Sequence, residues 1–545
     1  MGRQERKGKE KAASRKDYFA ITGILAYIGS LIFRIPLLHM IGEKGVGYFS
    51  IANELFIVIG CIFAYGLSEA TANLVRYRIK REQFKNADKV LHRAAVLALI
   101  LGGGLSIIFL FAGHSYAKNV IQMPLAGLAV SLMAPAIVFY VLTGVLKGYF
   151  QGNGSRVPAI HSKVLETVFM IGGGLIGAGL MHKYGEKVSA LLQNEDYAAA
   201  YGAMGAVIGL LSASVLCFLH MLLLFFLYHG RVKRQGAREI QKNQDKGFHI
   251  VHMLLGTGLS YALFAAVFQL LPFLDGCLFI RLSPNTADTA ALWGSFYGKY
   301  MVIIGICSAL LSLVAVEPSK RIIFLLDREE YKAAKDKLAV IMHQIALLAV
   351  PTAIFTAVLA ENLLNLLFKG NNSKPAVWVM WGSITIVFYV FSSLFSGMMI
   401  RLRKMNYVIG YGLLALLAHV ITVILLLGNT DMGIVAVVIG NIIFYVVSAA
   451  LGFFLICRNL QYVQEVRSIA FTLIAAGIAG LIVMLLNRVF SSMLGSTISL
   501  VICLPIGIAA YLVLLIVSKG ICERELENIP GGIWLIRLAK VLRLM

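Results

Sequence analysis

Apolar segments long enough to cross a lipid bilayer recur along almost the whole chain. A spanning helix needs about 20 mostly apolar residues, and this criterion predicts fourteen spans. The predicted spans are 18–39, 48–75, 94–113, 125–146, 162–181, 198–228, 250–280, 290–316, 338–368, 376–400, 408–428, 432–457, 468–487 and 496–518. The composition agrees, since 59% of the residues are hydrophobic and only 14% are charged, against about 25% charged in soluble domains. The sequence therefore predicts an all-α, polytopic membrane protein.

The lysines and arginines fall mainly in alternate connections between these spans. If the N-terminus is cytoplasmic, the inside segments carry 39 of the 49 lysines and arginines and the outside segments carry eight. Cytoplasmic loops carry such an excess, so both termini are predicted to be cytoplasmic. The net charge of +22 then lies against an anionic leaflet. Anionic membrane lipids are expected partners, and nucleic acid is not.

A short internal repeat divides the predicted spans into two sets of six. Residues 138–148 read VFYVLTGVLKG and residues 387–397 read VFYVFSSLFSG, each at the end of a span. Six spans per repeat keep the same orientation, so a pseudo-twofold axis along the membrane normal would relate the two lobes. The expected organisation is a basic cytoplasmic tail (1–17), an N-terminal lobe (18–228), a basic cytoplasmic linker (229–249), a C-terminal lobe (250–457), two further spans (468–518) and an amphipathic cytoplasmic tail (519–545).

A few ionisable and amide side chains lie inside the predicted spans. Such residues are costly in a bilayer and are candidates for a functional site. The candidates are Arg34, Asn53, Glu54, Glu69, Asp275 and Lys299, whereas Glu166 and Glu361 lie closer to span ends and are expected at the interface. Arg34 alternatively reaches the membrane surface by snorkelling. The structural alternative for Asp275 and Lys299 is an ion pair with each other.

The sequence contains none of the signals expected of an enzyme or a metal centre. No phosphate-binding G-x-x-x-x-G-K-[ST] motif is present, and the seven cysteines show no C-x-x-C spacing. They are interpreted as small buried hydrophobic residues. We therefore expect a protein that is not an enzyme and that has no resident cofactor or metal. Coupling to a Na⁺ or H⁺ gradient stays open.

Several segments resemble the multidrug/oligosaccharidyl-lipid/polysaccharide (MOP) exporter superfamily. These segments are GSLIFRIPLLHMIGEKGVGYFSIANELF (29–56), VLKGYFQGNGSRVPAIHSKVLE (145–166), WGSFYGKYMVIIGICSALLSLVAVEPSKR (293–321), LLNLLFKGNNS (363–373) and TDMGIVAVVIGNII (430–443). The resemblance covers most of residues 18–457. Fourteen spans favour the branch that holds lipid II flippases and stage V sporulation protein B-like polysaccharide transporters.

This resemblance implies export of a polyprenyl-pyrophosphate-linked glycan from the inner to the outer leaflet of a bacterial cell membrane. In that family a cationic cavity takes the pyrophosphate. Arg34 and Lys299 match its basic positions, and Asp275 matches an aspartate of the sporulation-type members. Ile28, Gly29 and Ser30 stand where lipid II flippases often carry another arginine. Lipid II as the specific substrate therefore does not follow.

Three functions compete at this point. In the first, a secondary flippase binds the pyrophosphate through Arg34 and Lys299, while Glu54, Glu69 and Asp275 set coupling or cavity polarity, and a glycan synthase or polymerase is an expected partner. In the second, an ion-coupled antiporter of amphipathic cations uses these three carboxylates as ion sites. In the third, the chain is a membrane scaffold for a glycan-assembly complex.

Overall fold

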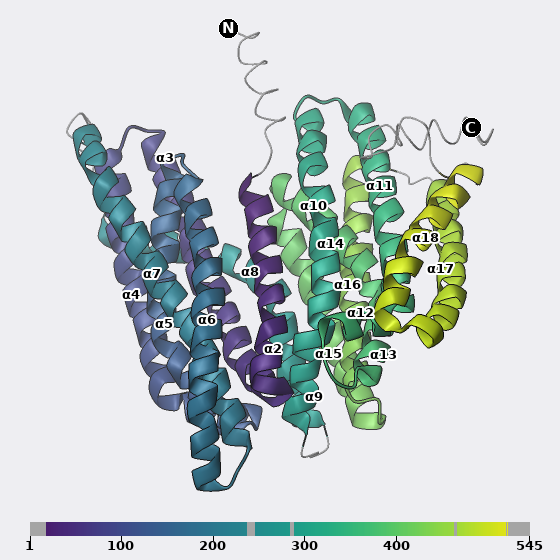
Figure 1. The fold of residues 1–545 in the computed structure, drawn as a ribbon. Helices are drawn as coiled ribbons and strands as arrows, with labels where there is room; N and C mark the ends of the chain where they lie inside the picture. Colours follow the sequence, from purple (N-terminus) through teal and green to yellow (C-terminus); the bar gives the residue numbers. More distant parts are fainter. Residues whose placement is uncertain (1–17, 237–245, 284–287, 463–465, 519, 521–545) are drawn as a thin grey trace. The chain divides into compact units, whose positions relative to one another are not determined.

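The computed structural model describes residues 18–236, 246–283, 288–462, 466–518 and 520, and helices make up nearly all of them. Within these ranges there is no strand, and thirteen helices are long and apolar enough to cross a membrane (Figure 1). This confirms the predicted all-α, polytopic class. The first of the thirteen, Tyr18–Ile79, contains the two spans predicted at 18–39 and 48–75. The predicted tails at 1–17 and 519–545 lie outside the described residues, apart from residue 520.

The long first helix owes its change of direction to a glycine. Helix α2 (Tyr18–Ile59) is interrupted at Gly42, whose φ of 71° and ψ of 177° are not helical. Only glycine adopts this combination without steric cost. The interruption falls between the two predicted spans and lies next to Glu43 and Lys44, whose contacts are described below.

The chain forms two compact units, and each is described by itself. Of the described residues, the larger unit comprises Tyr18–Val302 and Met405–Val437, and the smaller comprises Ile303–Lys404 and those from Val438 onward. The lobe boundaries predicted at 228 and 250 are not set by this grouping and stay a prediction.

The larger unit contains most of the helices of the first half of the chain. Its elements are α2, η1 (Gly60–Tyr65), α3 (Gly66–Ile79), α4 (Phe84–Ser115), η2 (Tyr116–Ile121), η3 (Pro124–Ala126), α5 (Gly127–Gly152), α6 (Val157–Leu192), α7 (Asp196–Gly236), α8 (Gly247–Leu282), α9 (Thr289–Ser295), η4 (Phe296–Tyr300) and α15 (Met405–Asn429). Helix α7 extends eight residues into the segment 229–249 that was predicted as the linker. Residues 147–161, which connect two predicted spans, hold the end of α5 and the start of α6 around a short turn.

Glycines bring α6 and α7 together. A methyl group placed on Gly177 would lie 2.3 Å from the carbonyl oxygen of Gly205, and one placed on Gly205 would lie 2.2 Å from that of Gly177. Without a hydrophobic driving force in lipid, such close backbone approach is a common source of helix association. The glycine pair therefore fixes the position of α7 against α6.

The smaller unit contains the remaining helices and a separate apolar core. Its elements are the larger part of α10 (Met301–Leu326), α11 (Tyr331–Val358), α12 (Ala360–Leu367), α13 (Ser373–Gly382), α14 (Ile384–Arg401), most of α16 (Ile434–Leu460), α17 (Val466–Leu494) and α18 (Ser496–Val517). Its core joins Phe355 of α11 with Ala479 of α17 and Cys503 of α18. The Tyr511 hydroxyl donates a hydrogen bond to the Leu347 carbonyl at 2.9 Å, which further ties α18 to α11.

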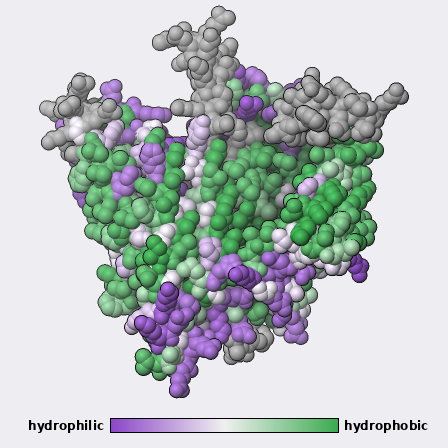
Figure 2. Space-filling view, viewed as in Figure 1, coloured by the Kyte–Doolittle hydropathy of each residue, from purple (hydrophilic) through white to green (hydrophobic). Residues whose placement is uncertain are grey.

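The surfaces of these helices are suited to lipid. Large apolar side chains such as Ile100, Leu180 and Leu485 are more than half exposed. Figure 2 shows hydrophobic side chains along the middle of the helices on the face in view and hydrophilic ones near helix ends. Exposed apolar surface on this scale is typical of a membrane protein, and the fold is therefore multi-pass.

Candidate functional site

The candidate site is built where α2 crosses α9 and η4, all within the larger unit. A methyl group on Gly294 would lie 1.8 Å from the carbonyl oxygen of Glu43, and one on Gly47 would lie 2.2 Å from that of Ala290. The two backbones therefore touch, and residues separated by about 250 positions in the sequence become neighbours. Glycine is required on both sides of this crossing.

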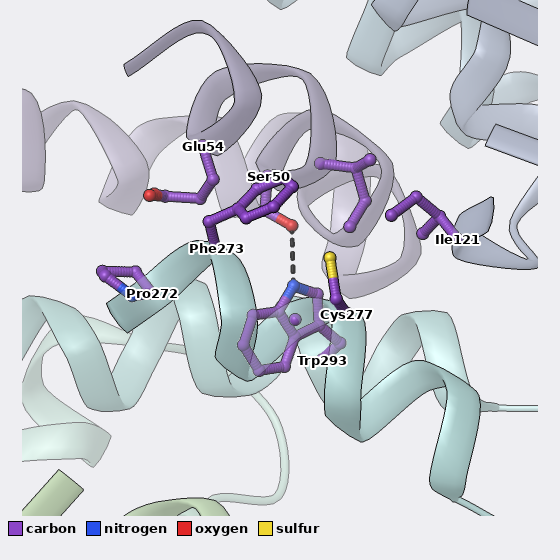
Figure 3. A pocket seen from close by; sticks show the side chains of 9 residues that line it. Ser50, Glu54, Ile121, Pro272, Phe273, Cys277 and Trp293 are labelled. Atoms are coloured by element: carbon purple, nitrogen blue, oxygen red, sulfur yellow. Dashed lines mark hydrogen bonds between the residues drawn. The ribbon is translucent and has the colours of Figure 1, made fainter. Parts of the chain in front are cut away.

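Aromatic side chains secure the crossing. Trp293 stacks on Phe279 with ring centroids 6.0 Å apart and packs against Phe296 at 5.2 Å. The indole Nε1 of Trp293 donates a hydrogen bond to the Ser50 hydroxyl at 2.8 Å (Figure 3). A buried tryptophan N–H needs such a partner, so this bond orients the ring against α2.

A small pocket lies beside Trp293. It has a cavity volume of about 10 Å³ and is lined by Ser50, Ile51, Glu54, Ile121, Pro272, Phe273, Gly276, Cys277 and Trp293 (Figure 3). Its lining is mainly apolar, and Glu54 is its one carboxylate. This volume is below the usual range of small-molecule sites, so this pocket alone does not hold a glycan.

Arg34 is held at the crossing by three kinds of contact. Its guanidinium carbon lies 3.6 Å from the centroid of the Tyr297 ring, and Nη1 donates to the Tyr297 carbonyl at 3.2 Å. Nη2 lies 3.8 Å from Oε1 of Glu54, and both side chains are 7% exposed. The Tyr297 hydroxyl in turn accepts a hydrogen bond from Asn53 at 2.7 Å. Arg34 is therefore a buried group of the site and does not snorkel.

Lys299 lies two residues after Tyr297, and its carboxylate partner is not Glu54. Its Nζ is 2.7 Å from Oε1 of Glu43. The lysine side chain is 2% exposed, whereas that of Glu43 is 39% exposed. Lys299 therefore has a carboxylate partner on α2 that the sequence did not indicate, because the crossing at Gly294 brings Glu43 to the lysine.

Both Tyr297 and Lys299 belong to η4, a single turn of π-helix. Such turns insert an extra residue into a helix and are frequent at functional sites. Arg34, Lys299, Glu43 and Glu54 form a group of four charged side chains, two positive and two negative. We call this group the α2–η4 cluster. In this arrangement each cation that the sequence predicted for an anion site is already paired with a carboxylate.

Asp275 is paired elsewhere in the same unit. Its Oδ1 lies 3.0 Å from Nε2 of His419, and the two side chains are almost completely buried. The pair joins α8 to α15 and carries an ion pair only when the imidazole is protonated. The sequence predicted Asp275 as an intramembrane acid but gave no indication of His419.

Glu69 is separate from the α2–η4 cluster. It lies half-buried on α3, one turn before Asn73, whose amide donates to the Tyr261 hydroxyl at 2.9 Å. The structure therefore brings Arg34, Asn53, Glu54 and Lys299 together and leaves Glu69 apart, whereas Asp275 lies next to Gly276, which lines the same pocket as Glu54.

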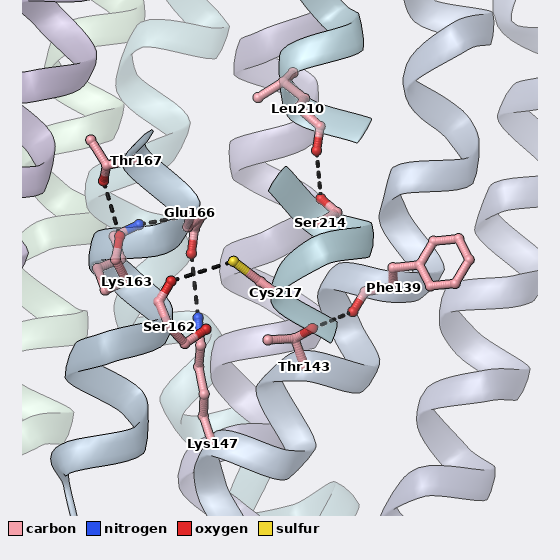
Figure 4. A network of polar contacts seen from close by, with 10 residues as sticks. All are labelled: Phe139, Thr143, Lys147, Ser162, Lys163, Glu166, Thr167, Leu210, Ser214 and Cys217. Atoms are coloured by element: carbon pink, nitrogen blue, oxygen red, sulfur yellow. Dashed lines mark hydrogen bonds and ion pairs between the residues drawn. The ribbon is translucent and has the colours of Figure 1, made fainter. Parts of the chain in front are cut away.

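A second group of charges was missed because its two lysines lie at the ends of predicted spans. Lys147 on α5 and Lys163 on α6 both reach Glu166, at 3.3 Å and 2.8 Å (Figure 4). The side chains of Lys147 and Glu166 are each 16% exposed. Glu166 therefore links two helices through partly buried contacts. Its expected position at the membrane interface stays a prediction.

Among the described residues, no group of three or more His, Cys, Asp or Glu side chains is placed to hold a metal ion. The polar chemistry of the site therefore comes from ion pairs, amides and aromatic rings.

Comparisons with known proteins agree with this fold. The family model described as MatE matches residues 19–172. Stage V sporulation protein B of Bacillus subtilis (strain 168) is 21% identical over 518 residues, which cover 93% of this chain and 95% of that protein. The chain resembles the MOP exporters. This confirms the resemblance predicted from the sequence segments.

Solved structures give the same MOP fold. An inward-facing multidrug resistance MATE family transporter of the MOP superfamily has a TM-score of 0.58 at 18% identity, over 80% of this chain and 94% of that one. An outward-facing multidrug resistance MATE family transporter of the MOP superfamily has a TM-score of 0.52 at 18% identity, over 82% of this chain and 97% of that one. The chain thus has the fold of a polytopic transporter.

Proposed function

We propose that the chain is a secondary exporter that moves a polyprenyl-pyrophosphate-linked glycan from the inner to the outer leaflet by alternating access. The observation that carries this proposal is the burial of two cations, Arg34 and Lys299, within one backbone crossing. Intramembrane charges are retained for substrate or ion pathways. Two cations at one helix crossing, Arg34 on α2 and Lys299 on η4, suit the several oxygens of a pyrophosphate.

The carboxylates that pair with these cations indicate how an anion would enter. Glu43 is more than one third exposed while Lys299 is buried, so Glu43 is the member of the pair that can turn away. A phosphate would then replace it on Nζ of Lys299. Glu54 is buried beside Arg34, and it would stay in place and limit the charge that Arg34 presents.

The resemblance to the stage V sporulation protein B-like branch supports a lipid-linked glycan as cargo, and the Bacillus relative is consistent with a bacterial cell membrane. Na⁺ or H⁺ coupling is proposed through the buried Asp275–His419 pair, whose charge changes with one proton. A glycan synthase or polymerase is the proposed partner, because its product is the cargo.

The second candidate is an ion-coupled antiporter of amphipathic cations. Two observations favour it: the two solved structures compared above are multidrug resistance transporters, and the α2–η4 cluster has as many carboxylates as cations. In that case Glu43 and Glu54 would bind the cargo, and Lys299 would compete with it.

The two candidates predict opposite effects for the two members of one ion pair. Lys299→Met keeps the volume of the side chain and removes its charge, so binding of a polyprenyl-pyrophosphate glycan should weaken by roughly 30-fold or more, as for a buried charge contact. Glu43→Gln removes the competing carboxylate and should strengthen binding by about 3- to 10-fold. Titration of the purified full chain followed by native mass spectrometry measures both.

Glu186→Gln is the matched control for Glu43→Gln, since its side chain is 62% exposed and lies outside the cluster. Its affinity should equal that of wild type. Weaker glycan binding in Glu43→Gln, or unchanged binding in Lys299→Met, contradicts the proposal. Weaker binding of a lipophilic cation in Glu43→Gln, with stronger binding in Lys299→Met, would instead assign the cluster to a cation antiporter.

A further inference from the structure

A second, larger pocket lies away from the α2–η4 cluster, between α4 and the start of α8. It has a cavity volume of about 240 Å³ and is lined by Lys89, His92, Arg93, Val96, Gly247 and Ile250. All six residues belong to the larger compact unit. Three of the six carry basic side chains, and neither the proposed transport function nor the comparisons give this pocket a role. We call it the α4–α8 pocket.

The basic side chains share one face of α4. Positions 89, 92, 93 and 96 recur at the i, i+3, i+4 and i+7 spacing that places residues on one side of a helix. Asp88 offsets part of the charge, since its Oδ2 lies 3.8 Å from Nδ1 of His92. The face still carries a net positive charge because Lys89 and Arg93 are on it.

Arg93 is placed where a cation is ordinarily disfavoured. A methyl group on Gly247 would lie 2.7 Å from the Arg93 guanidinium, so the guanidinium rests on the first residue of α8. The residue before it, Lys246, has no side-chain hydrogen bond that caps the helix. The N-terminal end of a helix carries a partial positive charge and attracts anions. Among the described residues, no carboxylate makes an ion pair with Arg93.

The positive end of α8 and the basic face of α4 therefore add to one positive potential inside a pocket. A group that carries negative charge and several acceptor oxygens would stabilise both at once, and phosphate has this chemistry. Basic pockets between transmembrane helices on the cytoplasmic side bind lipid phosphates in this way. The pocket joins segments 76–93 and 229–249, which the lysine and arginine distribution predicts to be cytoplasmic.

The remaining walls of the pocket distinguish a lipid from a soluble phosphate. Ile250 is fully buried at its floor, and Val96, one turn further along α4 than Arg93, is 52% exposed. Beyond Val96 the same face of α4 continues with Ile100, which is 64% exposed. A basic pocket that opens onto an exposed apolar helix face matches a phosphate head group followed by acyl chains.

We propose that the α4–α8 pocket binds the phosphate of an anionic phospholipid, with the acyl chains along α4. The site would hold α4 against α8 from the cytoplasmic leaflet. It does not depend on which cargo the chain carries, so it is distinct from the proposed transport function and is tested separately.

The test uses the purified full chain in neutral detergent, where no charged bilayer surface attracts lipids without specificity. Phosphatidylglycerol and phosphatidylcholine are titrated, and retained lipid is counted by native mass spectrometry. Wild type should retain phosphatidylglycerol in preference to phosphatidylcholine. In the double variant Lys89→Gln, Arg93→Gln, phosphatidylglycerol should bind roughly 30-fold more weakly, at about 5-fold for each cation removed.

The matched control is the double variant Lys80→Gln, Arg81→Gln, which loses the same charge from exposed positions of the same predicted cytoplasmic segment. It should bind phosphatidylglycerol as wild type does. Equal loss in the two double variants, or equal retention of the two lipids by wild type, would overturn the proposal. Displacement of phosphatidylglycerol by millimolar inorganic phosphate would also overturn it and assign the pocket to a soluble anion.

Loss of folding would not be confused with loss of the site. Arg93 is exposed and Lys89 is half-buried, so their replacement by glutamine should leave the unfolding midpoint in lipid-free detergent unchanged. The added stabilisation by phosphatidylglycerol should disappear in the pocket variant and persist in the control, since a ligand stabilises the state to which it binds.

Discussion

The two compact units bury different kinds of polar side chain. Among the side chains whose burial the structure describes, the buried Asp, Glu, Lys and Arg lie in the larger unit: Arg34, Glu54, Arg78, Asp275 and Lys299. In the smaller unit the buried polar side chains are hydroxyls, amides and a histidine, such as Ser392, Ser448, Asn362 and His343.

This difference shows that polar side chains serve two purposes in a membrane protein. Amides and hydroxyls join helices at small energetic cost, as in the 2.6 Å contact between Ser392 and Ser448, which links α14 to α16. Buried charges cost far more and persist where a pathway needs them. The larger unit therefore holds the groups that can respond to a charged cargo or an ion, and the smaller unit holds helix-joining contacts.

The largest expected effect on stability is at Arg34. Arg34→Ala leaves Glu54 buried without its cation, which should lower the free energy of unfolding by about 3–5 kcal/mol. Thermal unfolding in detergent measures the change. The double variant Arg34→Met, Glu54→Gln removes both charges and should recover most of the loss. If the double variant is as unstable as the single one, the destabilisation comes from lost packing and the contrast between the units weakens.

Part of this site could be predicted from the sequence. Arg34, Glu54, Asp275 and Lys299 stand out because a charge inside an apolar run is recognisable without any structure. Their partners could not be predicted, because pairing depends on which helices cross. Tyr297 lies 263 positions from Arg34, and Glu43 was assigned to a loop, where carboxylates are ordinary.

The fold could also be predicted only in part. Apolar length located the helical segments, but their ends depend on local contacts that hydropathy does not report. The predicted spans end just before Lys147 and begin just before Lys163, whereas Glu166 neutralises part of the charge of both lysines within α5 and α6. The π-helical turn at η4 likewise has no hydropathy signature, and it is what places Tyr297 and Lys299 toward α2.

A smaller but still large effect is expected at the backbone crossing that carries the site. Gly294→Ala would force a methyl group to within 1.8 Å of the Glu43 carbonyl, so α2 and α9 must separate. The expected loss is about 2–3 kcal/mol, together with weaker binding at the α2–η4 cluster. Gly477→Ala in α17 of the smaller unit is the control, because nothing lies within 4 Å of the added methyl group. The thermal unfolding midpoint of Gly477→Ala should equal that of wild type or be slightly higher.

The smallest effect should come from the neutral network of the smaller unit. The Asn362 amide donates to Asn487 and to the Ser496 carbonyl, both at 2.9 Å, and so ties α12 to α17 and α18. Interhelical hydrogen bonds in membranes average about 0.6 kcal/mol, so Asn362→Ala should lower the free energy of unfolding by about 1 kcal/mol and leave glycan binding unchanged. A loss as large as that of Arg34→Ala, or a change in glycan affinity, would contradict the division of roles between the units. Since Asn362 is buried to the same degree as Arg34, the comparison separates the effect of charge from that of burial.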